Sequence, residues 1–272
     1  MVLNVLILSV TEIVYLLGIV ITVGFLLGWI EAASNRWAYQ AFGKSGIMIT
    51  ACIGTPIHEM GHALMCLLFG HKINSIKLFV MNPQNSTLGY VIHSYNKNNL
   101  YQRMGNFFIS IGPIFSGTIA ILFFMYMLEP TTFVALQKYV VAAPVGSTNI
   151  VDVIKWSSHS IILVYTGIVN SGSLGSPSFW LFLLLAICTA SHMALSTEDI
   201  KNATSGLIVI LVVVIFLNVG ASLYGIETLK YVQSVAKYNI YLVSVLSVSI
   251  TCSLVTASIM GISYRLKRVI KR

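Results

Sequence analysis

Long apolar runs separated by short polar segments dominate this chain. A helix needs about 20 consecutive apolar residues to cross the hydrocarbon core of a bilayer. Six stretches approach that length, namely residues 3–30, 46–69, 107–128, 178–195, 204–226 and 239–263. A shorter apolar segment, 157–170, is expected to form a re-entrant or interfacial piece. The pattern predicts an all-α membrane protein with about six transmembrane helices.

One polar segment, between the second and third apolar stretches, has a different pattern. Residues 73–80 alternate in part between apolar and polar side chains, and residues 87–95 are rich in β-prone types. Asn, Pro and Ser residues at 82–86 supply a turn between them. We therefore predict a small β-hairpin. Its edge strand would hold an unwound substrate by strand addition, and an ordinary polar connector is the alternative.

The basic residues predict which side of the membrane each segment faces. Five of them directly follow the last apolar stretch: Arg265, Lys267, Arg268, Lys271 and Arg272. Such a cluster marks the cytoplasmic side and attracts anionic lipid. With six spans, both termini are then cytoplasmic, and so is the hairpin segment, whose charged residues are all basic. We expect an integral, multi-pass protein with the lipid bilayer as its main surroundings.

Composition narrows the class of protein further. The 272 residues are 57% hydrophobic and only 9% charged, whereas a soluble domain has about 25% charged residues. A single polytopic membrane domain, residues 1–272, is therefore expected. The net charge of +8 does not indicate a nucleic-acid partner, because the basic residues form no continuous stripe. The four cysteines lie in apolar segments without paired spacing, so no disulfide framework is indicated.

The second apolar stretch carries the strongest chemical signal. Residues 58–62 read His-Glu-Met-Gly-His, and this spacing on a helix puts His58 and His62 on one face, within reach of a single ion. Glu59 can take a proton from a zinc-bound water, whose pKa the metal lowers toward about 7. The motif predicts a zinc site with Glu59 as catalytic base. A polar contact between helices or a proton relay is the alternative interpretation.

A catalytic zinc ion usually has three protein ligands, and residues 191–201 offer candidates for the third. His192, Ser196 and Asp199 follow an i, i+4, i+7 spacing, so one helical face could present all three. We predict Asp199 as the third ligand. His192 is the second candidate and would also suit a supporting role beside a developing oxyanion. Without a metal, Asp199 would be a helix cap and His192 a buried, hydrogen-bonded residue.

In this order, the motifs resemble the site-2 protease family of intramembrane zinc metalloproteases. The resemblance rests on the His-Glu-Met-Gly-His motif with Gly70 at the end of its helix, the Gly112-Pro113 pair in the next span, and Asp199 near a later span. The third-ligand candidate stands in Ser-Thr-Glu-Asp-Ile rather than in the family's usual Leu-Asp-Gly. The chain would thus be a minimal or divergent member without a PDZ domain.

The resemblance implies both a fold and an activity. A three-helix catalytic core would occupy residues 46–206, with accessory helices at 1–30 and 207–264. The zinc ion would lie inside the membrane near its cytosolic face. The implied reaction is hydrolysis of a peptide bond in or near a transmembrane segment of a membrane protein substrate, as in regulated intramembrane proteolysis.

Two other classes of function remain open from the sequence. A membrane metalloprotease that acts on cytosolic-face or soluble peptides would use a glutamate as third ligand, and Glu198 could serve. A non-catalytic zinc-binding or transport protein is the other class. A binding protein has little need of a base such as Glu59 beside the first ligand, and a transporter would have ionisable residues in several spans. We interpret the polar residues as concentrated at one place, which favours the protease.

Overall fold

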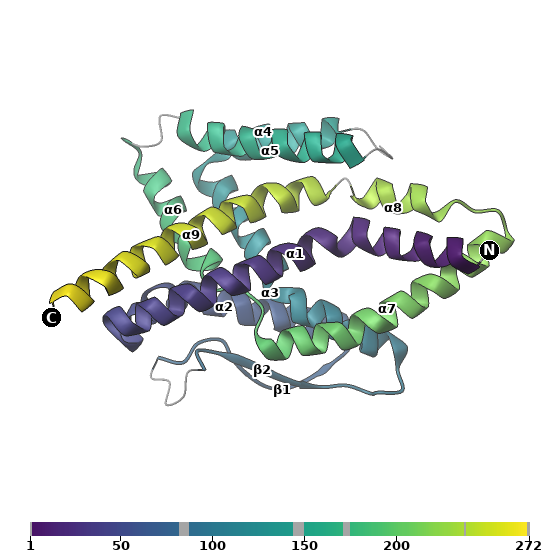
Figure 1. Ribbon diagram of the computed structural model, residues 1–272, viewed down its shortest axis with the longest axis horizontal. Helices are drawn as coiled ribbons and strands as arrows, with labels where there is room; N and C mark the ends of the chain where they lie inside the picture. Colours follow the sequence, from purple (N-terminus) through teal and green to yellow (C-terminus); the bar gives the residue numbers. More distant parts are fainter. Residues whose placement is uncertain (1, 82–86, 144–149, 171–174, 237, 271–272) are drawn as a thin grey trace.

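The computed structural model describes residues 2–81, 87–143, 150–170, 175–236 and 238–270, and these form nine helices and one two-stranded sheet (Figure 1). In chain order they are α1 (Val2–Phe42), α2 (Lys44–Leu68), β1 (Lys72–Lys77), β2 (Tyr90–Ser94), α3 (Leu100–Leu128), α4 (Pro130–Ala142), α5 (Ile150–Asn170), α6 (Pro177–Ala190), α7 (Thr197–Leu223), α8 (Thr228–Ala236) and α9 (Asn239–Ile270). The prediction of a mostly helical protein with one small hairpin is confirmed.

Four of the helices in the described residues are long and apolar enough to cross a membrane, namely α1, α3, α7 and α9. This agrees with the expected membrane protein. Helix α2 has 25 residues, but its polar motif lowers its hydropathy. Helix α6 has 14 residues, which is about 21 Å of helix and shorter than the roughly 30 Å hydrocarbon core. The number of spans, about six, stays a prediction.

The first helix is longer than the apolar run that predicts it, because it continues through residues 31–42 to Phe42. Gly43 then separates α1 from α2 with a φ of 68°, a conformation that glycine adopts without steric cost. The segment 157–170, expected as a short re-entrant or interfacial piece, is likewise part of a 21-residue helix, α5. Hydropathy therefore located these helices but underestimated their lengths.

Helices α1 and α9 pack side by side and run in the same direction (Figure 1). Near their first contacts, Asn239 donates a hydrogen bond to the carbonyl of Tyr15 (2.7 Å). Near their last, the Nζ of Lys267 donates to the carbonyls of Gln40 (3.3 Å) and Ala41 (2.6 Å), which places a positive charge at the C-terminus of α1. If both helices cross the bilayer, the two chain ends face opposite sides. The location of both termini on the cytoplasmic side stays a prediction, and the parallel packing of α1 and α9 does not favour it.

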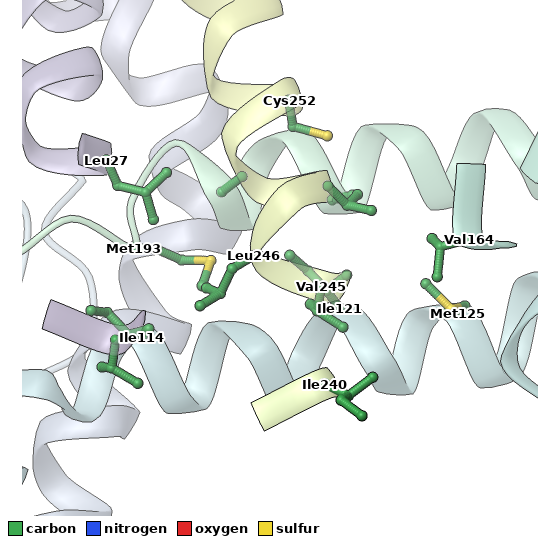
Figure 2. Packing of buried hydrophobic residues seen from close by; sticks show 14 of the residues in the cluster. Leu27, Ile114, Ile121, Met125, Val164, Met193, Ile240, Val245, Leu246 and Cys252 are labelled. Carbon is green, nitrogen blue, oxygen red and sulfur yellow. The ribbon is translucent and has the colours of Figure 1, made fainter. Parts of the chain in front are cut away.

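The hydrophobic core is built around α3, whose buried residues meet side chains of α1, α5, α9 and the segment after α6 (Figure 2). Its labelled members include Leu27, Ile114, Ile121, Met125, Val164, Met193, Val245 and Leu246. Dispersion contacts among such side chains hold helices together in a membrane, where the hydrophobic effect contributes little between them. Helix α3 therefore fixes the relative positions of the helices around it.

Helices α2 and α3 approach each other closely where Gly61 meets Gly112. A Cβ atom added to Gly61 would lie 2.5 Å from the carbonyl oxygen of Gly112, and one added to Gly112 would lie 2.6 Å from that of Gly61. Ser116 reinforces the contact, since its hydroxyl donates to the carbonyl of Ile57 (2.7 Å). Small residues permit such backbone contact between membrane helices. The polar motif of α2 is thereby held against α3.

Strands β1 and β2 pair antiparallel from Lys72 opposite Ser94 to Lys77 opposite Tyr90, with an irregularity in register between Ile73 and Ser75. The predicted turn at 82–86 lies outside the described residues. The sheet packs against α2 (Figure 1). Its base is fixed there by Gln102 at the start of α3, whose side chain accepts from the main-chain amide of Asn96 (2.6 Å) and donates to the carbonyl of Gly70 (2.8 Å).

Candidate metal centre

The two histidines of the α2 motif face each other through their Nε2 atoms, which lie 3.1 Å apart. The Nδ1 of His58 lies 2.7 Å from the carbonyl oxygen of His192, and the Nδ1 of His62 lies 2.8 Å from that of Ile109. Because a carbonyl oxygen only accepts, each Nδ1 must carry the hydrogen. The Nε2 of each neutral ring is therefore left with a lone pair.

This arrangement places two lone pairs against each other in a partly buried setting. Two acceptors at 3.1 Å repel unless a proton or a metal ion lies between them. Histidine ligands of metals in proteins commonly donate their other ring N–H to a carbonyl or a carboxylate. Both His58 and His62 show that arrangement, so the pair fits a metal ion.

Asp199, in the first turn of α7, brings a third potential metal-binding atom to the same point. Its Oδ1 lies 3.6 Å from the Nε2 of His62, and donor atoms of His58, His62 and Asp199 all lie within 4.8 Å of one another. Two imidazole nitrogens and one carboxylate oxygen are ligand atoms that transition metals use in proteins. The structure thus brings the three predicted ligands together, and the group could hold a metal ion.

The other carboxylate oxygen of Asp199 is held by Ser196, the N-cap residue of α7. Its Oδ2 accepts from the main-chain N–H (2.9 Å) and the hydroxyl (2.6 Å) of Ser196, whose Oγ accepts from the main-chain N–H of Asp199 (3.1 Å). This reciprocal capping box satisfies amide groups at the helix start. Asp199 therefore caps the helix, as expected for a residue without a metal, and also offers an oxygen atom to the candidate metal site.

The prediction that one helical face presents His192, Ser196 and Asp199 is wrong. Helix α6 ends at Ala190 and α7 begins at Thr197, so the segment between them is not helical. Ser196 starts a new helix there, which ends any continuous i, i+4, i+7 relation. Outside a helix, the carbonyl of His192 has no partner four residues on and can accept from His58.

His192 contributes its main chain to the site, whereas its ring points elsewhere. Its Nε2 lies 3.0 Å from the hydroxyl of Thr50, and its Nδ1 lies 4.0 Å from the Oε1 of Glu31. The ring is not part of the group of convergent donors found in the described residues. Glu198, the ligand of the alternative interpretation, is exposed and also outside that group.

Glu59 is buried beside the candidate metal ligands, with 7% of its surface exposed. The hairpin covers it: a Cβ atom added to Gly89 would lie 2.8 Å from the Cγ of Glu59 and 2.9 Å from the Cγ2 of Thr55. The hydroxyl of Thr55 is buried and has no partner within the described part of the chain. The end of the sheet therefore lies directly over the predicted base.

A second pair of histidines lies at the base of the hairpin, and the sequence interpretation missed it. His71 donates through Nε2 to the carbonyl of Gln102 (2.7 Å), and its Nδ1 lies 3.0 Å from the Nδ1 of His93. Its ring stacks on Tyr95 with centroids 4.9 Å apart. Burial lowers the pKa of both histidines below 6.5, and that of His93 is lowered further by the charge on His71. The signal that could have revealed this pair was the presence of two histidines in the polar segment after the helix that carries the motif.

Buried polar residues are less concentrated than the sequence interpretation assumed. On α1 and α7, the Asn218 side chain donates to Glu12 (2.7 Å) and Ser9 (3.0 Å) and accepts from Thr228 (2.7 Å). Glu12 is only 3% exposed. This second cluster contains one ionisable side chain and lacks the convergent histidine and carboxylate donors of the first.

Comparisons of the chain with models of protein families, with curated proteins and with solved structures found no match. Its function is therefore inferred from the donor groups and their setting. The decisive features are the three convergent donors, the buried carboxylate beside them and the surrounding apolar helices.

Proposed function

We propose that this chain is an intramembrane zinc metalloprotease similar to the site-2 protease family, with about six spans. His58, His62 and Asp199 would hold the zinc ion, and Glu59 would act as the catalytic base. One observation carries the proposal: the Nε2 atoms of the two histidines lie 3.1 Å apart with both Nδ1 atoms bonded to carbonyl oxygens, and a carboxylate closes the group.

The donor set supports zinc as the metal. At zinc–ligand distances of about 2.0–2.2 Å and tetrahedral angles, neighbouring donors lie roughly 3.3–3.5 Å apart. Two of the three separations, 3.1 Å between the histidine nitrogens and 3.6 Å from His62 to Asp199, lie just outside the ends of that range, and all three ligand atoms lie within 4.8 Å of one another. Two imidazoles and one carboxylate are a common ligand set of catalytic zinc, and three protein ligands leave a position open for water.

The chemistry of the site follows from its polar groups. When bound, zinc supplies Lewis-acid polarisation of the scissile carbonyl and lowers the pKa of its water toward about 7. Glu59 accepts the proton of the attacking water and passes it to the leaving amine. Its burial beside Gly89 keeps bulk water away from the carboxylate. The carbonyls of His192 and Ile109 hold both histidine rings in the tautomer that leaves Nε2 free.

The surroundings of the site support a membrane-protein substrate. A helical peptide bond is shielded by its own hydrogen bonds, so the substrate segment must be extended at the point of cleavage. Among the described residues the two strands pair only with each other, which leaves their outer edges open, and the sheet lies over Glu59 through Gly89. Strand addition to one of these edges would hold an unwound segment beside the base. The four long apolar helices support delivery of that segment from the bilayer.

The test measures bound zinc and cleavage together in the purified protein in lipid nanodiscs. Wild type, Glu59→Gln, Asp199→Asn and the matched control Glu198→Gln are compared on a transmembrane substrate and on a soluble peptide with the same cleavage sequence. Glu59→Gln should keep zinc but lose cleavage by about 10²-fold or more, Asp199→Asn should weaken zinc, and Glu198→Gln should match the wild type. Undiminished cleavage by Glu59→Gln would overturn the mechanism. Preference for the soluble peptide would overturn the substrate class.

A further inference from the structure

We infer that Glu31, on α1 outside the predicted catalytic core, is a positioning residue for the metal ligands. It would act through residues 191–196, here called the α6–α7 segment. The inference rests on the proposed metal site and deepens it, because it gives the N-terminal helix a part in metal binding.

The α6–α7 segment holds two of the three proposed ligands. At its start, the carbonyl of His192 accepts from the Nδ1 of His58 (2.7 Å). At its end, Ser196 fixes the Oδ2 of Asp199 through two hydrogen bonds. His58 lies on α2 and Asp199 on α7, and this segment of six residues contacts both side chains. A shift of this segment would rotate the His58 ring and displace the Asp199 carboxylate together.

Glu31 is the side chain that fixes the middle of the segment from α1. Its Oε2 accepts from the main-chain N–H of Ala194 (3.3 Å), which has no helical partner. Its Oε1 accepts from Asn35 (3.3 Å) and lies 4.0 Å from the Nδ1 of His192. Thr50 lies 3.0 Å from the Nε2 of that ring. The ring is thus held between α1 and α2 while its carbonyl faces His58.

The surface of α1 is shaped for this contact. Gly24, Gly28 and Glu31 follow an i, i+4, i+7 spacing and share one face of the helix. A Cβ added to Gly24 would lie 3.3 Å from the Cδ1 of Leu195, and one added to Gly28 would lie 4.0 Å from the Leu195 carbonyl. Beside this face, Leu27 belongs to the same buried cluster as Met193 of the segment (Figure 2). Helix α1 therefore packs on the segment itself.

Glu12 on the same helix is a matched control. It is a carboxylate buried more deeply than that of Glu31, with 3% of its surface exposed, and it is bonded to Asn218 of α7 (2.7 Å). No hydrogen bond joins its side chain to the α6–α7 segment within the described residues. Replacing Glu12 removes a buried acidic group from α1 without removing a contact to the segment. A general loss of folding would affect both positions, whereas a positioning role is specific to Glu31.

The experiment measures zinc affinity by competition with a chelator, using the full chain in nanodiscs, together with thermal unfolding of the metal-free protein. Glu31→Leu should weaken zinc binding about 10–100-fold, as loss of a residue that orients metal ligands does. Glu31→Gln should keep near wild-type affinity, because the amide oxygen can still accept from Ala194. Glu12→Leu should bind zinc as the wild type does even if its unfolding temperature falls. If Glu31→Leu does not fold, Glu31→Asp, whose shorter side chain retracts from Ala194, takes its place with the same expectation.

The results separate this inference from the proposed function. Failure of the wild type to bind zinc would overturn the proposed metal site and this inference with it. Wild-type affinity in folded Glu31→Leu, or in Glu31→Asp where that variant replaces it, would overturn the positioning role alone. An equal loss of affinity in Glu12→Leu would do the same, because the effect would then reflect general destabilisation of α1.

Discussion

Asp199 turns one carboxylate oxygen toward His62, at 3.6 Å from its Nε2, while its other oxygen is bonded to Ser196. The carboxylate therefore cannot rotate freely about its terminal bond. A ligand held in this way loses little conformational entropy when a metal binds. The capping box of α7 thus gives local structure a direct part in the proposed site.

Replacing Ser196 with alanine should weaken zinc binding about 10-fold, because the Oδ2 of Asp199 loses its hydroxyl partner. Loss of the N-cap should also cost about 1 kcal/mol of stability. Chelator competition measures the first effect and thermal unfolding the second. Ser205→Ala is the control, since the hydroxyl of this exposed serine of α7 donates to the carbonyl of Asn202 and, within the described part of the chain, bonds to no residue of the site. Unchanged zinc affinity in Ser196→Ala would show that the box does not orient Asp199.

Replacing Gly61 with alanine should destabilise the protein by about 1–3 kcal/mol, because the added Cβ would meet the Gly112 carbonyl at 2.5 Å. Cleavage should fall as well, since His62 moves with the displaced helix. Gly220→Ala on α7 is the control, because a Cβ there meets no atom within 4 Å in the part of the chain that the structure describes. Unfolding temperature and cleavage rate check both effects. Equal behaviour of the two variants would mean that the close crossing of α2 and α3 is not needed.

The features predicted best from the sequence are those that depend on the spacing of residues along a single helix or strand. His58 and His62 lie on one helical face because residues four apart always do, and the hairpin follows from alternation and turn residues. Asp199 was the predicted third ligand, and the structure places it with the histidines. Its surroundings were predicted wrongly. Ser196 and Asp199 have the spacing of a capping box, a signal for a new helix that was instead interpreted as part of a continuing one.

Other features depend on contacts that residue types do not specify. The carbonyls of His192 and Ile109 hold the two histidine rings, and any residue at either position has a carbonyl. Glu31 reaches the amide of Ala194 only because α1 packs on the α6–α7 segment. Hydropathy locates α1 and α9 but does not show that they run in parallel. These relations arise from tertiary packing over large sequence separations.

Acidification should loosen the base of the hairpin. The pKa of His71 and that of His93 are lowered below 6.5 by burial, so the unfolded hairpin binds protons more readily than the folded one. Their neutral forms contribute stability that is fully present above about pH 6.5 and is lost as the pH falls through the lowered folded values. Hydrogen exchange of β1 and β2, corrected for intrinsic rates, should therefore speed up between pH 7 and pH 5. The α5 helix around the exposed His159 should show no such change, and equal change in both would contradict the assignment.

Replacing Gly89 with alanine should reduce cleavage while zinc stays bound. The added Cβ would lie 2.8 Å from the Cγ of Glu59 and 2.9 Å from the carbonyl oxygen of Leu78, so the end of the hairpin must move away from the base. Zinc affinity should not change, because the three atoms nearest to that Cβ belong to Glu59, Leu78 and Thr55, none of which is a proposed ligand. Cleavage rate and bound zinc are measured in the same preparation, with Gly175→Ala as the control because a Cβ there meets no atom of the described residues within 4 Å. Loss of zinc in Gly89→Ala would mean that the hairpin supports the metal site itself. Unchanged cleavage would mean that its position over Glu59 has no part in the reaction.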